Sequence, residues 1–318
     1  MALYLTEADV QHVIDMPQTI DAVEQITIAQ STGRAWLVPR ERLRMPKGML
    51  HTMSAAWPER GYFAHKAYAS IAGSIRFRVL LYDYDTGAIR AWIEGNRLGQ
   101  LRTGAATAVA ARRLLPPDPS TWALFGTGLQ AEGQLEAMLA IGRPQQLRVF
   151  GRNADRRNDF AVLAAEQWEI DVVPAETPEA CIDGANVVIT ATTSRNPVFD
   201  GSRLQTGSFV AAVGANMLIR RELDGKALRA IDRIIVDDID TAKKESGMLL
   251  TPIEAGFMRW QDVATLPDLL AGRTPARRDD RETLCFHSLG SATWDLAAAI
   301  VAYENALEAG LGLELPID

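Results

Sequence analysis

The chain has few of the residues on which covalent or metal chemistry usually depends. Its 318 residues include four histidines and only two cysteines, Cys181 and Cys285. Each cysteine has apolar neighbours, which predicts buried free thiols rather than a disulfide or a metal site. A nucleophile elbow, a His-x-x-x-His pair, a Cys-x-x-Cys pair and a P-loop are all missing. Hydrolases and kinases therefore lose their usual sequence anchors, and we expect no metal.

Long apolar segments are missing as well. No run approaches the roughly 18 residues that a membrane helix needs. Residues 1–16 lack the basic start and apolar core of a secretory signal. We therefore expect a cytoplasmic protein that does not engage a membrane. The net charge of −7 disfavours nucleic acid as a partner, and the 47% hydrophobic content is ordinary for a folded soluble protein.

The first third of the chain predicts an α+β region. Residues 5–31 carry apolar positions at helical spacing, and Pro17 is expected to separate two helices. Four strand-like stretches follow, at residues 49–54, 62–69, 76–82 and 88–93, and Asp83–Gly87 resembles a hairpin loop. A helix is predicted from Leu98 to Leu115. The proline cluster at 116–119 ends it and marks the expected domain boundary.

Beyond this boundary the pattern alternates between strand and helix. Strands are predicted at residues 121–125, 147–150, 171–174, 186–191, 208–213 and 233–236, and helices at 130–141, 155–167 and 241–249. Such alternation predicts an α/β fold with a Rossmann-type, doubly wound parallel sheet. A last helix, at residues 292–307, could pack back on the N-terminal region. We thus expect a domain of residues 117–291 and another of residues 1–116 with 292–318.

A glycine loop opens the predicted Rossmann domain. Gly126-Thr127-Gly128 follows the strand that begins near Trp122 and precedes a helix, with Ala131 in place of the usual third glycine. Glycines there let a pyrophosphate approach the backbone and the positive end of the helix. The motif alone is weak, but its place between strand and helix is the context it requires. It predicts an NAD(P)-dependent oxidoreductase.

The end of the next strand leaves the choice of cofactor open. NAD enzymes usually place an acidic residue there for the adenosine ribose, whereas this chain has Gly151 followed by Arg152. Arg152 could bind a 2′-phosphate. It could equally be a solvated loop residue, because Arg156 and Arg157 lie nearby. The cofactor is therefore predicted as NAD or NADP, without a decision between them.

Four basic residues before the boundary are candidates for binding an anion: Arg40, His51, Lys66 and Arg102. Arg102 lies on a helix that is otherwise apolar and small. Lys66 lies on a predicted strand, where burial of an ammonium would need a compensating anion. Arginine can bind a carboxylate through two parallel hydrogen bonds, and lysine can add a proton donor. Ordinary surface salt bridges are the commoner role for such residues.

Several motifs together resemble the ornithine cyclodeaminase/mu-crystallin family over nearly the whole chain. They are Val38-Pro39-Arg40, Lys66, Asp83–Gly87, Leu101–Ala106, the loop from Gly126 to Ala131, Glu245-Ser246-Gly247 and the stretch from Phe286 to Asp295. Their number and order are far more specific than the glycine loop alone.

The resemblance implies a homodimer formed through the N-terminal domain, which would also bind the substrate. Arg40, Lys66 and Arg102 match the residues that bind the substrate α-carboxylate. The implied cofactor contacts are Ser74, Gly126, Gly128, Leu129, Gln130, Arg152, Thr192, Val213 and Ser288. The resemblance places His51, Asn216 and Leu289 at the substrate, and the site itself in a cleft facing the nicotinamide.

Two departures from the family pattern bear on the reaction. A cyclodeaminase has a catalytic aspartate where this chain has Asn216, and a neutral amide cannot replace that acid–base group. It also has a glutamate near the distal ammonium of its substrate, where this chain has His51. That histidine could equally be structural. Both changes remove negative charge and argue against ornithine as substrate.

We therefore predict an NAD(P)H-dependent imine reductase or amino-acid dehydrogenase that forms an L-amino acid from a 2-imino acid or a cyclic ketimine. Arg40 and Arg102 would fix the carboxylate, and Lys66 would hold it or donate a proton to the imine nitrogen. Iminosuccinate is one specific candidate, with iminopyruvate and Δ1-pyrroline-2-carboxylate as competitors. Ornithine or lysine cyclodeaminase and a non-enzymatic, NADPH-dependent ligand-binding protein are the rival functions. The sequence leaves open the substrate side chain, the physiological direction and any assembly beyond a dimer.

Overall fold

The computed structural model describes residues 2–317, which form two compact units. The first unit comprises the chain up to Ala106 together with the segment from Gly290 onward, and the second comprises Thr107–Leu289. The division falls inside helix α3 (Asn96–Leu114), ahead of the proline cluster at which the sequence suggests a boundary.

The first unit is built on a seven-stranded sheet in the order β15-β1-β6-β5-β4-β3-β2. All neighbouring strands are antiparallel except β1 and β6. The strands are β1 (Ala2–Leu5), β2 (Trp36–Met45), β3 (Gly48–Trp57), β4 (Tyr62–Ile71), β5 (Ser74–Asp83), β6 (Ile89–Glu94) and β15 (Leu313–Leu315). The predicted antiparallel sheet is present, and β5 and β6 are joined through Asp83–Gly87.

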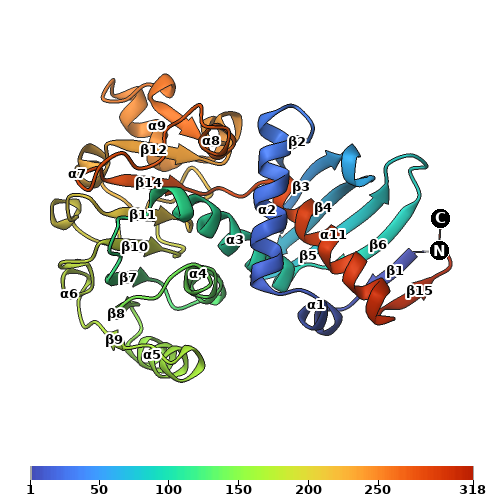
Figure 1. The fold of residues 1–318 in the computed structure, drawn as a ribbon, viewed down its shortest axis with the longest axis horizontal. Coiled ribbons are helices and arrows are strands. Elements are labelled where there is room, and N and C mark those ends of the chain that lie inside the picture. Colours follow the sequence, from blue (N-terminus) through green and yellow to red (C-terminus); the bar gives the residue numbers. More distant parts are fainter. Residues whose placement is uncertain (1, 318) are drawn as a thin grey trace. The chain divides into compact units, whose positions relative to one another are not determined.

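Among the described residues, three α-helices lie entirely in this unit, α1 (Glu7–Val13), α2 (Met16–Ser31) and α11 (Ala292–Ala309), and the first part of α3 also belongs to it. Asp15 caps α2, and Pro17 lies in its first turn. The N–H groups of this turn make no hydrogen bond within the helix, so the missing N–H of proline costs nothing there. Pro17 therefore separates two helices as predicted. Helices α2 and α11 lie side by side across the sheet (Figure 1). Trp294 is 1% exposed and donates from Nε1 to Thr27 Oγ1 at 3.2 Å.

A β-bulge in β2 turns a basic side chain toward the helix-covered face. The register of β2 with β3 shifts between Val38 and Glu41. Bulges re-aim side chains because they insert an extra residue into the alternation. Val38 and Leu43 are 55% and 61% exposed on the outer face, whereas Arg40 is 4% exposed.

The second unit is built on an eight-stranded, all-parallel sheet in the order β13-β12-β14-β11-β10-β7-β8-β9. The strands are β7 (Thr121–Phe125), β8 (Gln146–Phe150), β9 (Val172–Pro174), β10 (Val187–Thr190), β11 (Phe209–Ala212), β12 (Arg233–Val236), β13 (Val263–Thr265) and β14 (Leu284–His287). The predicted Rossmann-type sheet is confirmed. Strand β14, which lies between β12 and β11, and the short edge strand β13 are missing from the sequence prediction.

The helices of this unit are α4 (Leu129–Leu139), α5 (Ala154–Trp168), α6 (Pro178–Ile182), α7 (Gly225–Ala230), α8 (Ile239–Glu245), α9 (Gly247–Glu254) and α10 (Leu266–Leu270). Figure 1 shows α6 and α7 on one side of the sheet and α4 on the other. Strands β10, β11 and β14 are buried along their whole length, as expected of strands covered on both faces. The predicted helix at 241–249 is two helices, because Ser246 ends α8 and caps α9.

Both cysteines are buried and free, as predicted. Within residues 2–317, the helices are too short or too polar to cross a lipid bilayer.

Candidate functional site

The glycine loop lies at the point where the strand order of the parallel sheet reverses. The chain passes from β7 to β8 and β9 on one side, and then returns to β10 on the other side of β7. Ligands of open α/β sheets bind at the carboxyl ends of the strands beside such a point. Gly126 has φ +123°, and a Cβ there would lie 2.5 Å from the Ala191 carbonyl oxygen. Only glycine therefore fits this close approach between the two loops.

Helix α4 begins at this loop without a side-chain cap. Its N-cap is Gly128, which has no side chain with which to cap the helix. By contrast, Asp15 and Asn153 cap α2 and α5. The first N–H groups of a helix bind anions readily, because they lack partners and lie at the positive end of the helix dipole. The end of α4 is thus suited to a pyrophosphate.

A buried carboxylate joins the loops that follow β10 and β11. Glu222 accepts from Thr192 N at 2.7 Å, from Thr192 Oγ1 at 2.8 Å, from Gly214 N at 2.8 Å and from Thr190 Oγ1 at 3.0 Å. Burial raises the pKa of Glu222, while these four donors favour its ionised form. A Cβ on Gly214 would lie 2.1 Å from the Thr192 carbonyl oxygen. The positions of Thr192 and of Val213, which precedes Gly214, therefore depend on Glu222.

The end of β8 carries an arginine rather than an acid. A Cβ at Gly151 would lie 3.0 Å from Thr127 Cγ2, so a larger residue would press on the glycine loop. Arg157 donates from Nη1 to the Gly151 carbonyl oxygen at 3.2 Å. Arg152 is exposed, and its guanidinium makes no hydrogen bond or ion pair with the part of the chain that the structure describes. It is therefore available to an anionic ligand.

Ser288 and Leu289 are held by a buried polar network in the second unit. Leu289 N donates to Asp237 Oδ2 at 2.6 Å, and Ser288 Oγ lies 3.5 Å from the same oxygen. Burial lowers the pKa of His287 to about 4, so its ring is neutral at neutral pH. This ring bridges the Ala212 carbonyl oxygen at 3.0 Å and Ser246 Oγ at 2.9 Å. The network fixes the chain just before the first unit resumes at Gly290.

In the first unit, a single carboxylate oxygen contacts two buried cations. Asp295 Oδ1, in the first turn of α11, lies 2.7 Å from Lys66 Nζ and 3.0 Å from Arg102 Nε. The three side chains are 2%, 3% and 9% exposed, respectively. Lys66 comes from β4 and Arg102 from α3. Asp295 is therefore the anion that burial of Lys66 requires.

The cluster leaves a buried donor for a ligand. Arg102 Nη1 is buried without a hydrogen-bond partner within residues 2–317. A Cβ on Gly290 would lie 3.0 Å from Arg102 Nη1 and 3.0 Å from Arg40 Nη2, so the two guanidinium groups meet at this glycine. Gly290 has φ +94°, which favours glycine, and any side chain there would displace both groups. Two converging guanidiniums are suited to a carboxylate.

The titration of Lys66 follows from this burial. Burial lowers the pKa of Lys66 to about 8, against the raising effect of Asp295, and the charges of Arg102 and Arg40 lower it further. Burial alone would raise the pKa of Asp295, but Arg102 and Lys66 hold that pKa below its ordinary value. The ammonium also lies 4.9 Å from the centre of the Phe77 ring. Lys66 can thus exchange a proton near neutral pH.

His51 lies on β3 beside these cations. Its ring stacks on Tyr68 at 4.3 Å with 3° between the planes, and its Nδ1 is buried without a hydrogen-bond partner among the described residues. Burial and the charges of Arg42 and Arg40 lower the pKa of His51 to about 4. The ring is therefore neutral and has an unused polar atom.

The structure brings together Arg40, Lys66 and Arg102 with His51 nearby, as the sequence suggests. Gly126, Gly128, Leu129 and Gln130 lie at the glycine loop and the start of α4, and Thr192 and Val213 follow the neighbouring strands. Asn216, Ser288 and Leu289 belong to the second unit, and Ser74 is an exposed residue at the start of β5 in the first.

Asp295 and Glu222 are absent from the residues that sequence reasoning selected. Asp295 could have been found, because its motif was recognised and a buried lysine needs an acid. Nothing in the sequence around Glu222 reveals its role. The described residues hold no cluster of three or more His, Cys, Asp or Glu side chains suited to a metal ion.

Comparison with known proteins identifies relatives over the full length. The family model "ornithine cyclodeaminase/mu-crystallin family" matches residues 2–310. A Δ1-pyrroline-2-carboxylate/Δ1-piperideine-2-carboxylate reductase of Azospirillum brasilense is 32% identical over 305 residues, covering 93% of each chain. Δ1-pyrroline-2-carboxylate reductase of Thermococcus litoralis, solved with NADH and L-proline, superposes with a TM-score of 0.94 at 28% identity, covering 98% of this chain and 100% of that one. An archaeal alanine dehydrogenase dimer with bound NAD has a TM-score of 0.93 at 29% identity, covering 99% and 98%.

Replacing the shared carboxylate should change the titration of Lys66. In Asp295→Asn the charge that raises the pKa of Lys66 is lost, so this pKa should fall below about 8, by roughly one unit or more. The ¹⁵N resonance of the Lys66 side chain, followed against pH, measures it directly, since the sequence has only five lysines. Asp83→Asn, which removes a partly buried carboxylate from Arg90, is the matched control. An unchanged Lys66 midpoint in Asp295→Asn would show that the pair is not coupled.

Proposed function

This chain belongs to the ornithine cyclodeaminase/mu-crystallin family, and from that premise we propose that it is a nicotinamide-dependent oxidoreductase that reduces a small 2-imino acid to an amino acid. The observation that carries the proposal is the buried cationic cluster of Lys66 and Arg102 on one oxygen of Asp295, with Arg102 Nη1 left without a hydrogen-bond partner among residues 2–317. The reductases and the dehydrogenase among its relatives support the same reaction class.

The residues of the second unit fit a dinucleotide. The start of α4 at the glycine N-cap Gly128 and the close approach at Gly126 suit a pyrophosphate. Glu222 holds the loops of Thr192 and Gly214 at the neighbouring strand ends, where the rest of a dinucleotide lies in this fold. Gln130 Oε1 is buried and has no hydrogen-bond partner within the described chain, so it too can accept from a ligand. A bound nicotinamide dinucleotide would supply the hydride.

The first unit would bind the substrate through its α-carboxylate. Arg40 and Arg102 meet at Gly290, where two guanidiniums can hold one carboxylate in a fixed orientation. Fixing this group also fixes the imine carbon attached to it, and such positioning contributes several kcal/mol to lowering a barrier (roughly 7–11 in the best-oriented cases).

Lys66 would provide the proton. Reduction of a C=N bond adds a hydride to carbon and needs a proton on nitrogen. The pKa of Lys66, about 8, leaves its ammonium mostly protonated at neutral pH yet able to release the proton. Asp295 Oδ1 holds Nζ at 2.7 Å and so keeps the ammonium in one place. Lys66 is accordingly the proposed catalytic residue, and Asp295 positions it.

The electrostatics of the pocket favour a second negative group on the substrate. Burial lowers the pKa of His51 most, and the charges of Arg42 and Arg40 lower it further, so the surroundings of this ring disfavour positive charge. The neutral ring offers a polar atom rather than a charge to the substrate side chain. We therefore take iminosuccinate, a 2-imino dicarboxylate that gives aspartate, as the preferred substrate. A distal ammonium, as in ornithine, would be repelled here.

Coenzyme oxidation with a panel of imino acids tests this proposal. The panel is oxaloacetate, pyruvate and glyoxylate, each with ammonia, and Δ1-pyrroline-2-carboxylate. We expect oxaloacetate with ammonia to give the highest kcat/KM. Lys66→Met should lower kcat by roughly 10²–10⁴-fold, the usual contribution of a general acid, whereas Lys47→Met, at an exposed lysine, should leave it unchanged.

Two results would contradict the proposal. Release of ammonia and proline from L-ornithine, without net consumption of NAD(P)H, would establish a cyclodeaminase and show that Asn216 does not prevent that reaction. Tight coenzyme binding without turnover of any imino acid would instead favour a ligand-binding protein.

The end of β8 supports a preference for NADPH. It lacks the acid that would accept from the ribose hydroxyls of NADH, and the guanidinium of Arg152 is available to a 2′-phosphate. We expect NADPH to bind more tightly than NADH by about tenfold or more, the effect of a charge-assisted hydrogen bond. In fluorescence titrations, Arg152→Asp should make NADH bind more tightly than NADPH. The control Arg203→Asp changes an arginine that lies 3.9 Å from Asp183, and it should leave the preference for NADPH unchanged. Tighter binding of NADH to the unaltered protein would refute this assignment.

The outer face of the seven-stranded sheet supports a homodimer. Trp36, Val38 and Leu43 on β2 are 54%, 55% and 61% exposed, and large apolar side chains in this number mark an interface. One of the relatives was solved as a dimer. Sedimentation should give the mass of two chains for the unaltered protein and of one chain for Trp36→Glu. Leu163→Glu, at an equally exposed position on α5, should remain dimeric. A monomeric unaltered protein would rule the dimer out.

A further inference from the structure

A second cavity lies in the Rossmann-type unit, apart from the glycine loop. It has a volume of about 750 Å³ and lies between α7, α9 and the loops that follow β10 and β11. This volume is within the range of roughly 300–1,000 Å³ that is typical of small-molecule sites. None of the residues used above for the dinucleotide or the imino acid lines it.

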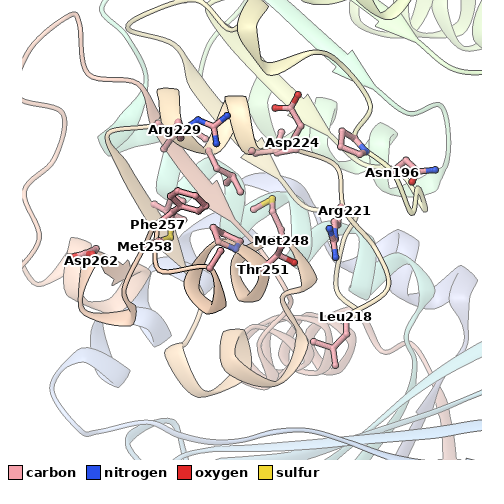
Figure 2. A pocket seen from close by; sticks show the side chains of 18 of the residues that line it. Asn196, Leu218, Arg221, Asp224, Arg229, Met248, Thr251, Phe257, Met258 and Asp262 are labelled. Atoms are coloured by element: carbon pink, nitrogen blue, oxygen red, sulfur yellow. The ribbon is translucent and has the colours of Figure 1, made fainter.

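The floor of the cavity is apolar, and its rim exposes large apolar side chains. Leu223, Leu228 and Met248 form the floor at 2%, 7% and 2% exposure. At the rim, Phe257 is 75% exposed and Leu218 is 51% exposed. Figure 2 shows Phe257, Met248 and Thr251 facing the middle of the cavity. An apolar ligand would cover the exposed rim and so remove this surface from water.

The lining of the cavity carries four arginines and three aspartates, a formal excess of one positive charge. The side chains of Arg195, Arg221 and Arg229 make no ion pair or hydrogen bond with any residue from 2 to 317. The acids of the lining are already engaged. Asp224 accepts from Ala227 N and Gly201 N, Asp232 accepts from Thr283 N, and Asp262 pairs with Arg259.

Two of these arginines lie at one end of the cavity. Arg221 N donates to the Ser194 carbonyl oxygen at 3.3 Å, which brings the segment of Arg195 against that of Arg221. In the view of Figure 2, Arg229 lies near Phe257, across the cavity from Arg221. The cavity thus has a cationic end at Arg195 and Arg221, and an apolar body along Met248, Leu228 and Phe257.

We propose that this cavity binds an amphipathic carboxylate, with its head group at Arg221 and Arg195 and its apolar tail over Met248, Leu228 and Phe257. Arginine binds carboxylates through two parallel hydrogen bonds, which a neutral head group cannot reproduce. The ligand would also contact the segment 217–221, which connects Asn216 to Glu222. That segment is held on its other side by Gly247, where a Cβ would lie 2.0 Å from the Leu218 carbonyl oxygen. The site is independent of the proposed reaction.

Calorimetric titration of the full-length protein with octanoate tests the proposal, with 1-octanol as the neutral probe of equal chain length. Octanoate should bind at one site, and 1-octanol should bind more weakly by about tenfold or more, because it lacks the charge-assisted bonds. Arg221→Gln should weaken the binding of octanoate by a similar factor. Arg229→Gln, an equally exposed arginine of the same cavity but at its other end, should have a much smaller effect. Phe257→Ser should weaken the binding of both octanoate and 1-octanol.

Octanoate could also enter the cationic cluster of the first unit, so Arg40→Gln serves to separate the two sites. Binding should persist in Arg40→Gln and be weakened in Arg221→Gln. The proposal is overturned if octanoate does not bind, if it binds no better than 1-octanol, or if Arg40→Gln abolishes binding while Arg221→Gln retains it. All these substitutions except Arg40→Gln are at exposed side chains, and thermal melting verifies that each variant is folded.

Discussion

The first unit depends on one buried ion cluster, in which a single oxygen of Asp295 holds both Lys66 and Arg102. Breaking a buried ion pair by removing one partner is costly, about 3–5 kcal/mol, because it leaves a charge without compensation. The three side chains come from α11, β4 and α3, so the cluster can form only when the C-terminal helix packs on the sheet of the N-terminal segment. The contact with Asp295 raises the pKa of Lys66 against the lowering effect of burial, and Asp295 also holds Arg102. Stability and the proposed chemistry thus rest on the same atoms.

The second unit uses buried polar groups in a similar way. Glu222 joins the loops after β10 and β11, and Asp237 holds the backbone of Leu289. In each case a carboxylate accepts from backbone N–H groups at the carboxyl ends of parallel strands, where the sheet itself offers no partners. Glycines at 126 and 214 then allow neighbouring loops to approach within contact distance. The result is a rigid edge of the sheet on which a dinucleotide can be placed.

The sequence predicts features that depend on local patterns. The alternation of strands and helices, the separation of two helices at Pro17 and the glycine loop at the strand reversal all follow from residues close together in the chain. The resemblance to a known family placed Arg40, Lys66 and Arg102 in one site, and these side chains lie close together in the first unit. Strand β14 was missed because it has only four residues. It also follows a charged loop instead of a helix, so it does not continue the alternation of strand and helix. Asp295 was missed as a partner because 229 residues separate it from Lys66, and the role of Glu222 depends on a loop geometry that no local pattern encodes.

The central claim is that this cationic cluster binds a substrate with two negative groups. Calorimetric binding of succinate and butyrate, which have the same number of carbon atoms but two carboxylates and one, respectively, tests it without any turnover. The account predicts that succinate binds more tightly by about tenfold or more, in line with one additional charge-assisted interaction. Equal or tighter binding of butyrate would contradict it, because the region around His51 would then be suited to an apolar side chain.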